Sequence, residues 1–187
     1  VVLHLIEQNI IDKDKVVISG YSYGGNAVYS ALAFKPDLFI AGIAGAGDAD
    51  LFKAIKLEPS EPIRTHWKTL MFGNPTISKK EMEKASRIRS PIHHVENIKA
   101  PLLIISPTDD KIVFYKQTEL MLKALNAHNK EYVAFKINNA VHDMGSFENR
   151  IASIAIQEDF LKDIFKLEET EPIGEALEKA PDIVWVD

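Results

Sequence analysis

Apolar runs and amphipathic segments alternate along this chain, and they predict strands that alternate with helices. Apolar residues recur at helical spacing over residues 1–9, and a polar turn over residues 12–15 separates this helix from a strand over residues 16–19. A second helical pattern over residues 27–34 ends before a proline, and residues 39–44 are apolar on both faces, as in a buried parallel strand. The first quarter of the chain is therefore predicted to fold as helix, strand, helix, strand.

The second half of the chain repeats this alternation. It predicts a strand over residues 102–105, a helix over residues 116–127, an alternating strand over residues 132–137 and a long helix over roughly residues 147–166. Four strands that alternate with helices predict a mostly parallel sheet with helices on both faces, which is an α/β fold.

Two segments depart from this alternation. Between residues 51 and 98 the periodicity weakens, and helical pieces over Glu61–Phe72 and Lys79–Ile88 lie between prolines and glycine, so we expect an insertion that covers the site from above. From Glu168 the chain is acidic, with a short helical piece around residues 174–180 and no recognisable function. We therefore predict one domain over residues 1–167 and an acidic tail over residues 168–187.

The stretch Gly20-Tyr21-Ser22-Tyr23-Gly24 lies between the first predicted strand and the helix that follows it. The pattern G-x-S-x-G in that context is typical of a nucleophile elbow, in which a strained turn exposes the serine hydroxyl. Gly20 and Gly24 are expected to let the strand and helix pass closely, and the backbone N–H of Tyr23 to bind a developing oxyanion. The bare pattern also recurs by chance in packing turns, so it needs support from the rest of the chain.

That support comes from the order of the polar residues that follow the strands. Ser22 follows the first strand, Asp109-Asp110 the third and His142 the fourth, which is the chain order of the α/β-hydrolase triad. In such a triad His142 would take the proton of Ser22, and the carboxylate would orient the imidazole and stabilise the imidazolium.

Composition excludes several other classes of protein. The 187 residues are 46% hydrophobic, enough to bury one core, and they include no cysteine, which fits a reducing compartment such as the cytoplasm but leaves localisation open. The net charge of -5 argues against a nucleic-acid or anionic membrane surface, and the apolar runs are too short to span a bilayer. We therefore expect neither nucleic acid nor a membrane as a partner.

Several motifs in register resemble the catalytic domain of prolyl oligopeptidase family serine peptidases. They are the elbow with its doubled glycine, the block over residues 89–104, the loop over residues 110–113, and His142 followed by Glu148-Asn149-Arg150. The resemblance runs from about residue 1 to residue 166. It implies an α/β-hydrolase fold whose N-terminal strands are missing from this chain.

The resemblance also implies a role for each matching residue. Ser22 matches the nucleophile, His142 the base and Asp110 the acid, because the family has a valine three residues after its acid and Val113 fits only Asp110. Asp109 is the alternative acid. The chain departs from the family pattern at Ser106-Pro107, at Phe114 after Val113, and at Asp143 after His142, and these departures affect the expected pocket shape and the mobility of His142.

Other polar and aromatic residues have a plainer interpretation that we prefer. His93-His94 with Asp109-Asp110 could be imagined as metal ligands, but a solvated turn is the better interpretation and we predict no metal. Asp48 and Asp50 follow the second strand, where some hydrolases carry the acid, but turn and N-cap roles are expected. A further set of residues could line a substrate pocket and is expected to serve packing: His66, Trp67 and Phe72.

The sequence therefore predicts a serine hydrolase, a peptidase that cleaves peptide or aminoacyl bonds through an acyl-enzyme on Ser22 without a cofactor. One alternative is an esterase or other acyl hydrolase, because fold and triad do not specify the leaving group. A second is a non-catalytic module that keeps the fold for interaction.

We also expect these residues to be the C-terminal part of a larger protein. Only four strands are predicted, and the family sheet has earlier ones. The strand Val16–Ser19 would then be an exposed apolar edge, open to self-association or to pairing with a missing N-terminal segment or accessory domain.

Overall fold

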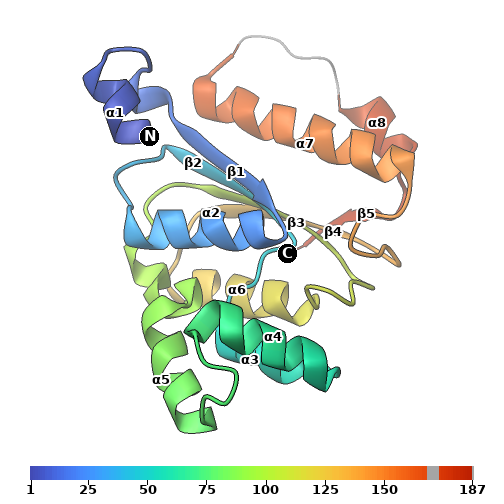
Figure 1. Ribbon diagram of the computed structural model, residues 1–187. Coiled ribbons are helices and arrows are strands. Elements are labelled where there is room, and N and C mark those ends of the chain that lie inside the picture. The colour runs from blue at the N-terminus through green and yellow to red at the C-terminus, as the bar shows by residue number, and fades with distance from the viewer. Residues whose placement is uncertain (168–172, 187) are drawn as a thin grey trace.

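A five-stranded sheet lies at the centre of this computed structural model, which describes residues 1–167 and 173–186 (Figure 1). The strand order in the sheet follows the chain. The first four strands are parallel and the last is antiparallel to its neighbour. The strands are β1 (Val17–Tyr21), β2 (Ala41–Gly45), β3 (Leu102–Pro107), β4 (Tyr132–Ile137) and β5 (Ile183–Trp185).

Helices cover both faces of the sheet, as the alternation predicts (Figure 1). One face carries α2 (Tyr23–Phe34), α6 (Lys116–Ala127) and the 3-10 segment η2 (Pro91–Asn97), and the other carries α7 (Phe147–Phe165). The short helix α1 (Val2–Glu7) and the 3-10 turn η1 (Lys13–Lys15) precede β1. The predicted bounds of α6 and β4 agree with the structure to the residue.

The layers bury two hydrophobic clusters, one on each side of the sheet. On the α2 and α6 side, Tyr29, Leu32 and Met121 pack against Leu102 and Ile104. On the α7 side, Ile156 and Phe160 pack against residues of β2 and β3 that include Ile43, Leu103 and Ile105. Because β2 and β3 are buried at every position, the sheet is fixed between its two helical layers.

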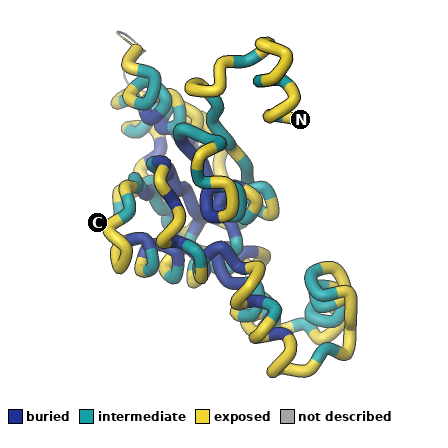
Figure 2. The backbone as a smooth tube through the Cα atoms, turned by 90° about the vertical axis from the view of Figure 1, so that its left-hand side faces the viewer, coloured by how far each residue is buried: buried dark blue, intermediate teal, exposed yellow. Residues whose placement is uncertain are grey.

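The segment between β2 and η2 forms three helices. They are α3 (Leu51–Leu57), α4 (Glu61–Phe72) and α5 (Lys79–Arg89), and α3 was not predicted. Asp50 caps α3 through its side chain, and Ser78 and Glu81 form a capping box at the start of α5. Figure 2 shows the burial concentrated in the sheet and the helices that pack on it, and α4 has no buried residue.

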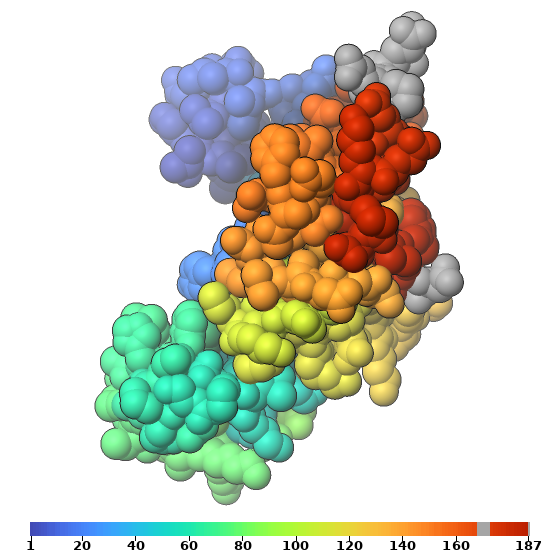
Figure 3. Space-filling model, turned by 90° about the vertical axis from the view of Figure 1, so that its right-hand side faces the viewer, coloured from blue at the N-terminus to red at the C-terminus, as the bar shows by residue number. Residues whose placement is uncertain are grey.

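The C-terminal residues contribute a strand that the sequence does not predict. β5 pairs antiparallel with β4, so the described sheet has five strands and not four. The short helix α8 (Gly174–Glu178) packs beside α7, and these C-terminal residues lie against α7 in the space-filling view (Figure 3). Residues 168–172 of the predicted tail lie outside the described residues.

The first strand is an edge of the sheet, as expected. Among the described residues β1 pairs with β2 alone, Val17 and Ile18 are half-buried, and Ser19 is exposed. No helix among the described residues has the length and apolar character needed to cross a bilayer.

Candidate active site

The site is built on the turn that joins β1 to α2. Ser22 occupies that turn with φ 59° and ψ −119°, and a positive φ costs free energy for a residue with a side chain. Two backbone hydrogen bonds hold it there: the N–H of Ser22 donates to the carbonyl of Gly45 at 2.8 Å, and its carbonyl accepts from the N–H of Asn26 at 3.2 Å. The strained turn is therefore anchored to β2 on one side and to α2 on the other.

Two glycines make this close packing possible, and one of them differs from the prediction. A Cβ on Gly20 would lie 2.5 Å from the backbone of Gly24, and a Cβ on Gly25 would lie 2.4 Å from the carbonyl oxygen of Gly45. A Cβ on Gly24 would meet nothing within 4 Å. The expectation that Gly24 is needed for close approach is therefore wrong, and Gly25 has that role, together with Gly20.

A continuous chain of hydrogen bonds joins three side chains from the carboxyl ends of three strands. The Nε2 atom of His142 lies 2.9 Å from Oγ of Ser22, and its Nδ1 atom lies 2.6 Å from Oδ2 of Asp110. Asp110 is buried, with 2% of its surface exposed. Its Oδ1 atom accepts the backbone N–H groups of Ile112 and Val113 at 2.8 and 2.9 Å. The carboxylate is thus held by three donors and cannot turn away from the imidazole.

The neighbouring carboxylates are placed differently. Asp109 is exposed, and its backbone N–H donates to Ala140. Asp50 caps α3 as expected, since its Oδ1 atom accepts the backbone N–H of Lys53 at 3.1 Å. Asp48 caps no helix: it is half-buried and lines a cavity beside Ser22. The N-cap or turn role expected for Asp48 is therefore wrong.

Tyr21 contacts the loop that carries His142 through a hydrogen bond and through its ring. Its hydroxyl donates a 2.6 Å hydrogen bond to the backbone carbonyl of His142, and the two rings lie 5.4 Å apart. Burial, and then the negative charges of Asp110 and Asp143, raise the pKa of Tyr21 above its usual value, so the hydroxyl remains a donor. The sequence carries no signal for this contact, because Tyr21 and His142 lie on elements far apart in the chain.

The cavity beside Ser22 measures about 40 Å³ and is lined by the turn, by α3 and α4, and by the loop after β3. Figure 3 shows α3 and α4 next to that loop. Trp67 of α4 lines the cavity with Met71, whereas His66 and Phe72 do not. The segment between residues 51 and 98 therefore borders the site, and the expectation that Trp67 serves only packing is wrong.

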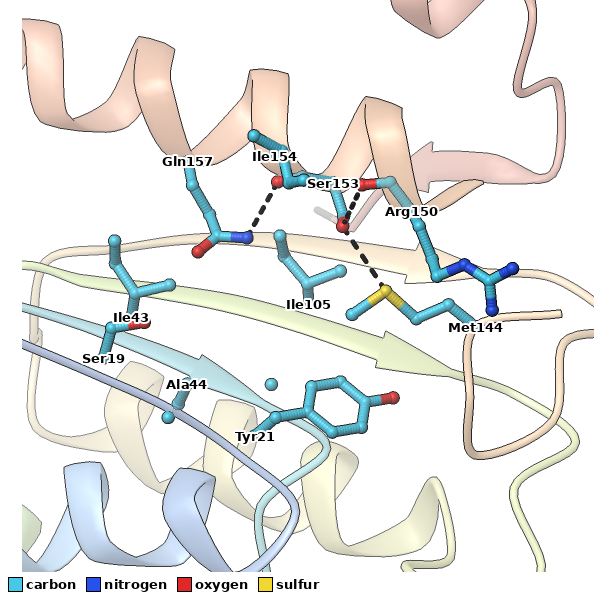
Figure 4. Close-up of a pocket in the computed structure, with 12 residues that line it drawn as sticks. Ser19, Tyr21, Ile43, Ala44, Ile105, Met144, Arg150, Ser153, Ile154 and Gln157 are labelled. Atoms are coloured by element: carbon cyan, nitrogen blue, oxygen red, sulfur yellow. Dashed lines mark hydrogen bonds between the residues drawn. The ribbon is translucent and has the colours of Figure 1, made fainter. Parts of the chain in front are cut away.

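A second cavity, of about 340 Å³, lies on the other face of the sheet between β1, β2 and α7 (Figure 4). Tyr21 lines it together with Met144, which belongs to the loop between β4 and α7 that carries His142, called here the histidine loop. The hydroxyl of Ser153 donates to Sδ of Met144 at 3.3 Å. Asn149 of α7 donates to the carbonyl of Met144 at 2.9 Å, which ties the histidine loop to that helix.

The histidines considered as metal ligands lie elsewhere. The ring of His94 packs on Phe34 with centroids 4.7 Å apart, and its Nε2 atom lies 3.0 Å from the carbonyl of Ile88. Within the described ranges, no group of three or more histidine or carboxylate residues is arranged to hold a metal ion.

The electrostatics of the site set Asp48 apart from Asp110. Burial and, to a smaller extent, the negative charge of Asp110 raise the pKa of Asp48 to about 7, against the opposing effect of His142. No hydrogen bond or ion pair to the carboxylate of Asp48 occurs among the described residues.

Comparison with known proteins identifies the family. A sequence model of the prolyl oligopeptidase family matches residues 1–168, and the chain belongs to that family. It is similar to dipeptidyl aminopeptidase BIII of Pseudoxanthomonas mexicana, with 29% identity over 175 residues, which are 90% of this chain and 24% of that protein. It is also similar to dipeptidyl peptidase family member 6 of Caenorhabditis elegans, with 24% identity over 64% of this chain and 16% of that protein. The chain thus spans a quarter or less of the length of these relatives.

Solved structures show the same fold. An acylaminoacyl peptidase of Pyrococcus horikoshii superposes with a TM-score of 0.75 and 24% identity over 94% of this chain and 28% of that one. A puromycin-hydrolyzing peptidase of Mycobacterium tuberculosis gives a TM-score of 0.76 and 20% identity over 87% of this chain and 24% of that one. The fold is therefore that of the α/β-hydrolase peptidases.

Proposed function

We propose that this member of the prolyl oligopeptidase family is a serine peptidase that cleaves peptide or aminoacyl bonds through an acyl-enzyme on Ser22. The observation that carries the proposal is the hydrogen-bonded chain from Ser22 through His142 to Asp110. Family membership supports hydrolysis of a peptide bond rather than another acyl bond. We place this chemistry in a domain over residues 1–167.

In this mechanism Oγ of Ser22 attacks the carbonyl carbon while Nε2 of His142 takes its proton. The imidazolium that forms donates through Nδ1 to Asp110, whose other oxygen is held by two backbone N–H groups. His142 then gives the proton to the leaving amine, and the acyl group remains on Ser22. A water molecule activated by the same imidazole hydrolyses the acyl-enzyme and regenerates the serine.

The oxyanion that develops on the substrate needs a donor beside Ser22. Tyr23 is the first residue of α2, and the N–H groups of the first helical turn have no partner within the helix. The backbone N–H of Tyr23 is therefore free to donate to the oxyanion, and the positive end of the helix dipole favours that charge.

Labelling with a fluorophosphonate tests the nucleophile, because the reagent reacts with an activated serine. We expect stoichiometric labelling of Ser22 and none in the Ser22→Ala variant. Ser22→Ala and His142→Ala should each lower kcat by several orders of magnitude, and the double variant should be little worse, because the members of a triad act as a unit. Losses that add in the double variant would contradict the proposal.

Two adjacent carboxylates provide a matched control. Asp110→Asn should lower kcat by orders of magnitude, because it removes the charge that stabilises the imidazolium, whereas Asp109→Asn removes the same charge from an exposed position and should change kcat little. The reverse result would assign the acid to Asp109. Comparing aminoacyl amides with simple acyl esters separates a peptidase from an esterase.

A further inference from the structure

We propose that the cavity beside Ser22 binds a cationic side chain, with Asp48 as the group that selects it, so that the protein prefers lysine at the residue whose carbonyl is attacked. The inference rests on the proposed function and adds a substrate class to it. It is carried by the position of the cavity, by the groups that line it and by the surroundings of Asp48.

The position of the cavity determines which part of a substrate can enter it. Ser22 and Tyr23 both line it, so it lies beside the nucleophile and next to the N–H proposed to bind the oxyanion. When Ser22 attacks a carbonyl, the acyl-side residue lies on one side of the scissile bond and the leaving group on the other. The cavity lies next to the Tyr23 N–H that is proposed to hold the carbonyl oxygen, so the acyl-side residue, which carries that oxygen, faces it.

The lining of the cavity suits a cation on an apolar stem. Of the described residues, the charged ones that line it are Asp48 and Glu58, and neither lysine, arginine nor histidine is among them. The remaining walls are apolar or aromatic, and they include Trp67, a residue type whose ring attracts ammonium groups. The apolar and aromatic residues of the lining, apart from Tyr23, are Ala54, Ile55, Trp67, Met71, Ile112 and Val113.

Asp48 is available to a ligand, and the neighbouring Asp50 is not. Asp50 accepts the N–H of Lys53 at 3.1 Å and the hydroxyl of Ser86 at 3.3 Å, and its second oxygen lies 3.5 Å from Nζ of Lys53. The backbone carbonyl of Asp48 accepts a hydrogen bond from the side-chain amide of Asn26 at 2.6 Å. The carboxylate of Asp48 accepts no hydrogen bond from any described residue. A half-buried carboxylate without a donor gains free energy when a cation reaches it.

The charges around Asp48 strengthen this argument. Burial and the nearby negative charge of Asp110 make ionisation of Asp48 costly and raise its pKa to about 7. A bound ammonium group would offset both effects, so a cation and the ionised form of Asp48 stabilise each other. The titratable groups that face Asp48 from neighbouring elements are Tyr29 of α2, Glu58 after α3, Asp110 after β3 and His142 after β4.

The size of the cavity favours lysine over arginine. Because a water-sized group needs roughly 10–15 Å³ of such space, a volume of about 40 Å³ holds roughly three non-hydrogen atoms. That is enough for an ammonium nitrogen with its last methylene groups. A guanidinium carries four non-hydrogen atoms in a rigid plane and fits less well.

The test compares kcat/KM for a set of N-blocked aminoacyl amides with lysine, arginine, norleucine or glutamate at the acyl position. We expect the order lysine, arginine, norleucine, glutamate. Asp48→Asn should lower the ratio of lysine to norleucine by about 10- to 100-fold, the range expected for a hydrogen bond to a charged group. Asp109→Asn removes one negative charge from an exposed position and should leave that ratio as it is.

Two further measurements test whether the charge of Asp48 is responsible and whether the cavity binds a side chain or the α-ammonium group. In the unsubstituted protein the lysine to norleucine ratio should rise as pH passes through about 7, because Asp48 ionises, while pH effects on the catalytic step are common to both substrates and cancel in the ratio. The norleucine amide is also assayed with a free amino group, and a preference for the free amine that Asp48→Asn abolishes would show that the cavity binds the substrate's α-ammonium instead.

Failure of this inference is distinguishable from failure of the proposed function. If Ser22 labels with fluorophosphonate and the protein hydrolyses the norleucine amide as fast as the lysine amide, the inference is wrong and the serine peptidase proposal stands. If Ser22 does not label and no amide is hydrolysed, the proposed function fails and this inference fails with it. Labelling of the Asp48→Asn variant shows that the variant is folded.

Discussion

The hydrogen bond from Tyr21 to the backbone of His142 is predicted to position the imidazole. Tyr21→Phe removes the donor and keeps the ring that packs 5.4 Å from the imidazole. A hydrogen bond between neutral groups contributes about 0.5–1.5 kcal/mol net. Both partners are half-buried, so water replaces part of the lost bond and the lower half of that range applies.

The expected rate follows from that free energy. If all of it appears as displacement of His142 from its hydrogen bond to Ser22, then about 1.4 kcal/mol per factor of ten converts it into a kcat loss of roughly 2- to 5-fold. KM should stay the same, since Tyr21 does not line the cavity beside Ser22. The fluorophosphonate labelling rate should fall by the same factor, because it depends on the same activated serine.

A matched variant controls for the loss of a tyrosine hydroxyl. The hydroxyl of Tyr132 donates to Asn126 at 3.0 Å on the surface, so Tyr132→Phe should change neither kcat nor the labelling rate. If Tyr21→Phe lowers the midpoint of thermal unfolding but leaves kcat and labelling unchanged, the bond serves packing only and the positioning argument is wrong. An equal loss in Tyr132→Phe would refute it too.

Two other predictions follow from the same geometry. Gly25→Ala should destabilise the protein and slow labelling, because its Cβ would lie 2.4 Å from the carbonyl oxygen of Gly45. The Cβ of Gly24→Ala faces open space, so this variant should stabilise α2 by up to about 1 kcal/mol. Thermal unfolding of both variants checks this prediction, and equal effects would contradict it. The pKa of Asp48 is raised from 3.8 in the free residue to about 7 in the folded protein, so without ligand the folded state loses stability as pH rises from about 4 to about 7. Asp48→Asn removes this loss and should therefore raise the unfolding midpoint more at pH 8 than at pH 5. A gain that is larger at pH 5 would contradict the burial argument.

Hydrophobic periodicity predicted the elements that bury one face or both. The bounds of α6 and β4 were predicted from clear hydrophobic periods of 3.6 and 2. β2 and β3 were predicted from continuous apolar runs, which are typical of strands buried on both faces. α3 was missed because it has seven residues and only Ile55 buried, too few for a period to emerge. β5 was missed because a three-residue edge strand is defined by its partner β4 rather than by its own pattern.

The positions of Ser22, Asp110 and His142 could be read from the sequence because Ser22 directly follows a strand and the other two lie in the loops that follow β3 and β4. The carboxyl ends of parallel strands meet at one edge of a sheet, so strand order alone brings these three side chains together. The structure adds the reason why Asp110 rather than Asp109 faces His142: two backbone N–H groups of the loop bind its other oxygen. That turn geometry depends on backbone dihedrals that the residue types leave open.

The contacts of Tyr21, Trp67 and Asp48 could not be predicted in this way, because each depends on elements packed from distant parts of the chain. Tyr21 contacts a loop 121 positions later, and Trp67 reaches the site only because α3 and α4 fold back beside the loop after β3. A local pattern describes which face of an element is apolar, but it does not say which element that face will meet.

The two carboxylates near Ser22 have different surroundings, and we propose a different role for each beside the proposed nucleophile. Asp110 has three donors, which keep its charge fixed toward His142, and Asp48 has none among the described residues. Both follow neighbouring parallel strands, so the fold places like charges close together and the charge of Asp110 makes ionisation of Asp48 harder. Because the charge of Asp110 is already stabilised by its donors, the cost falls on Asp48. A cation from the substrate is the one partner that would relieve that cost, and it would do so only while the substrate lies beside Ser22.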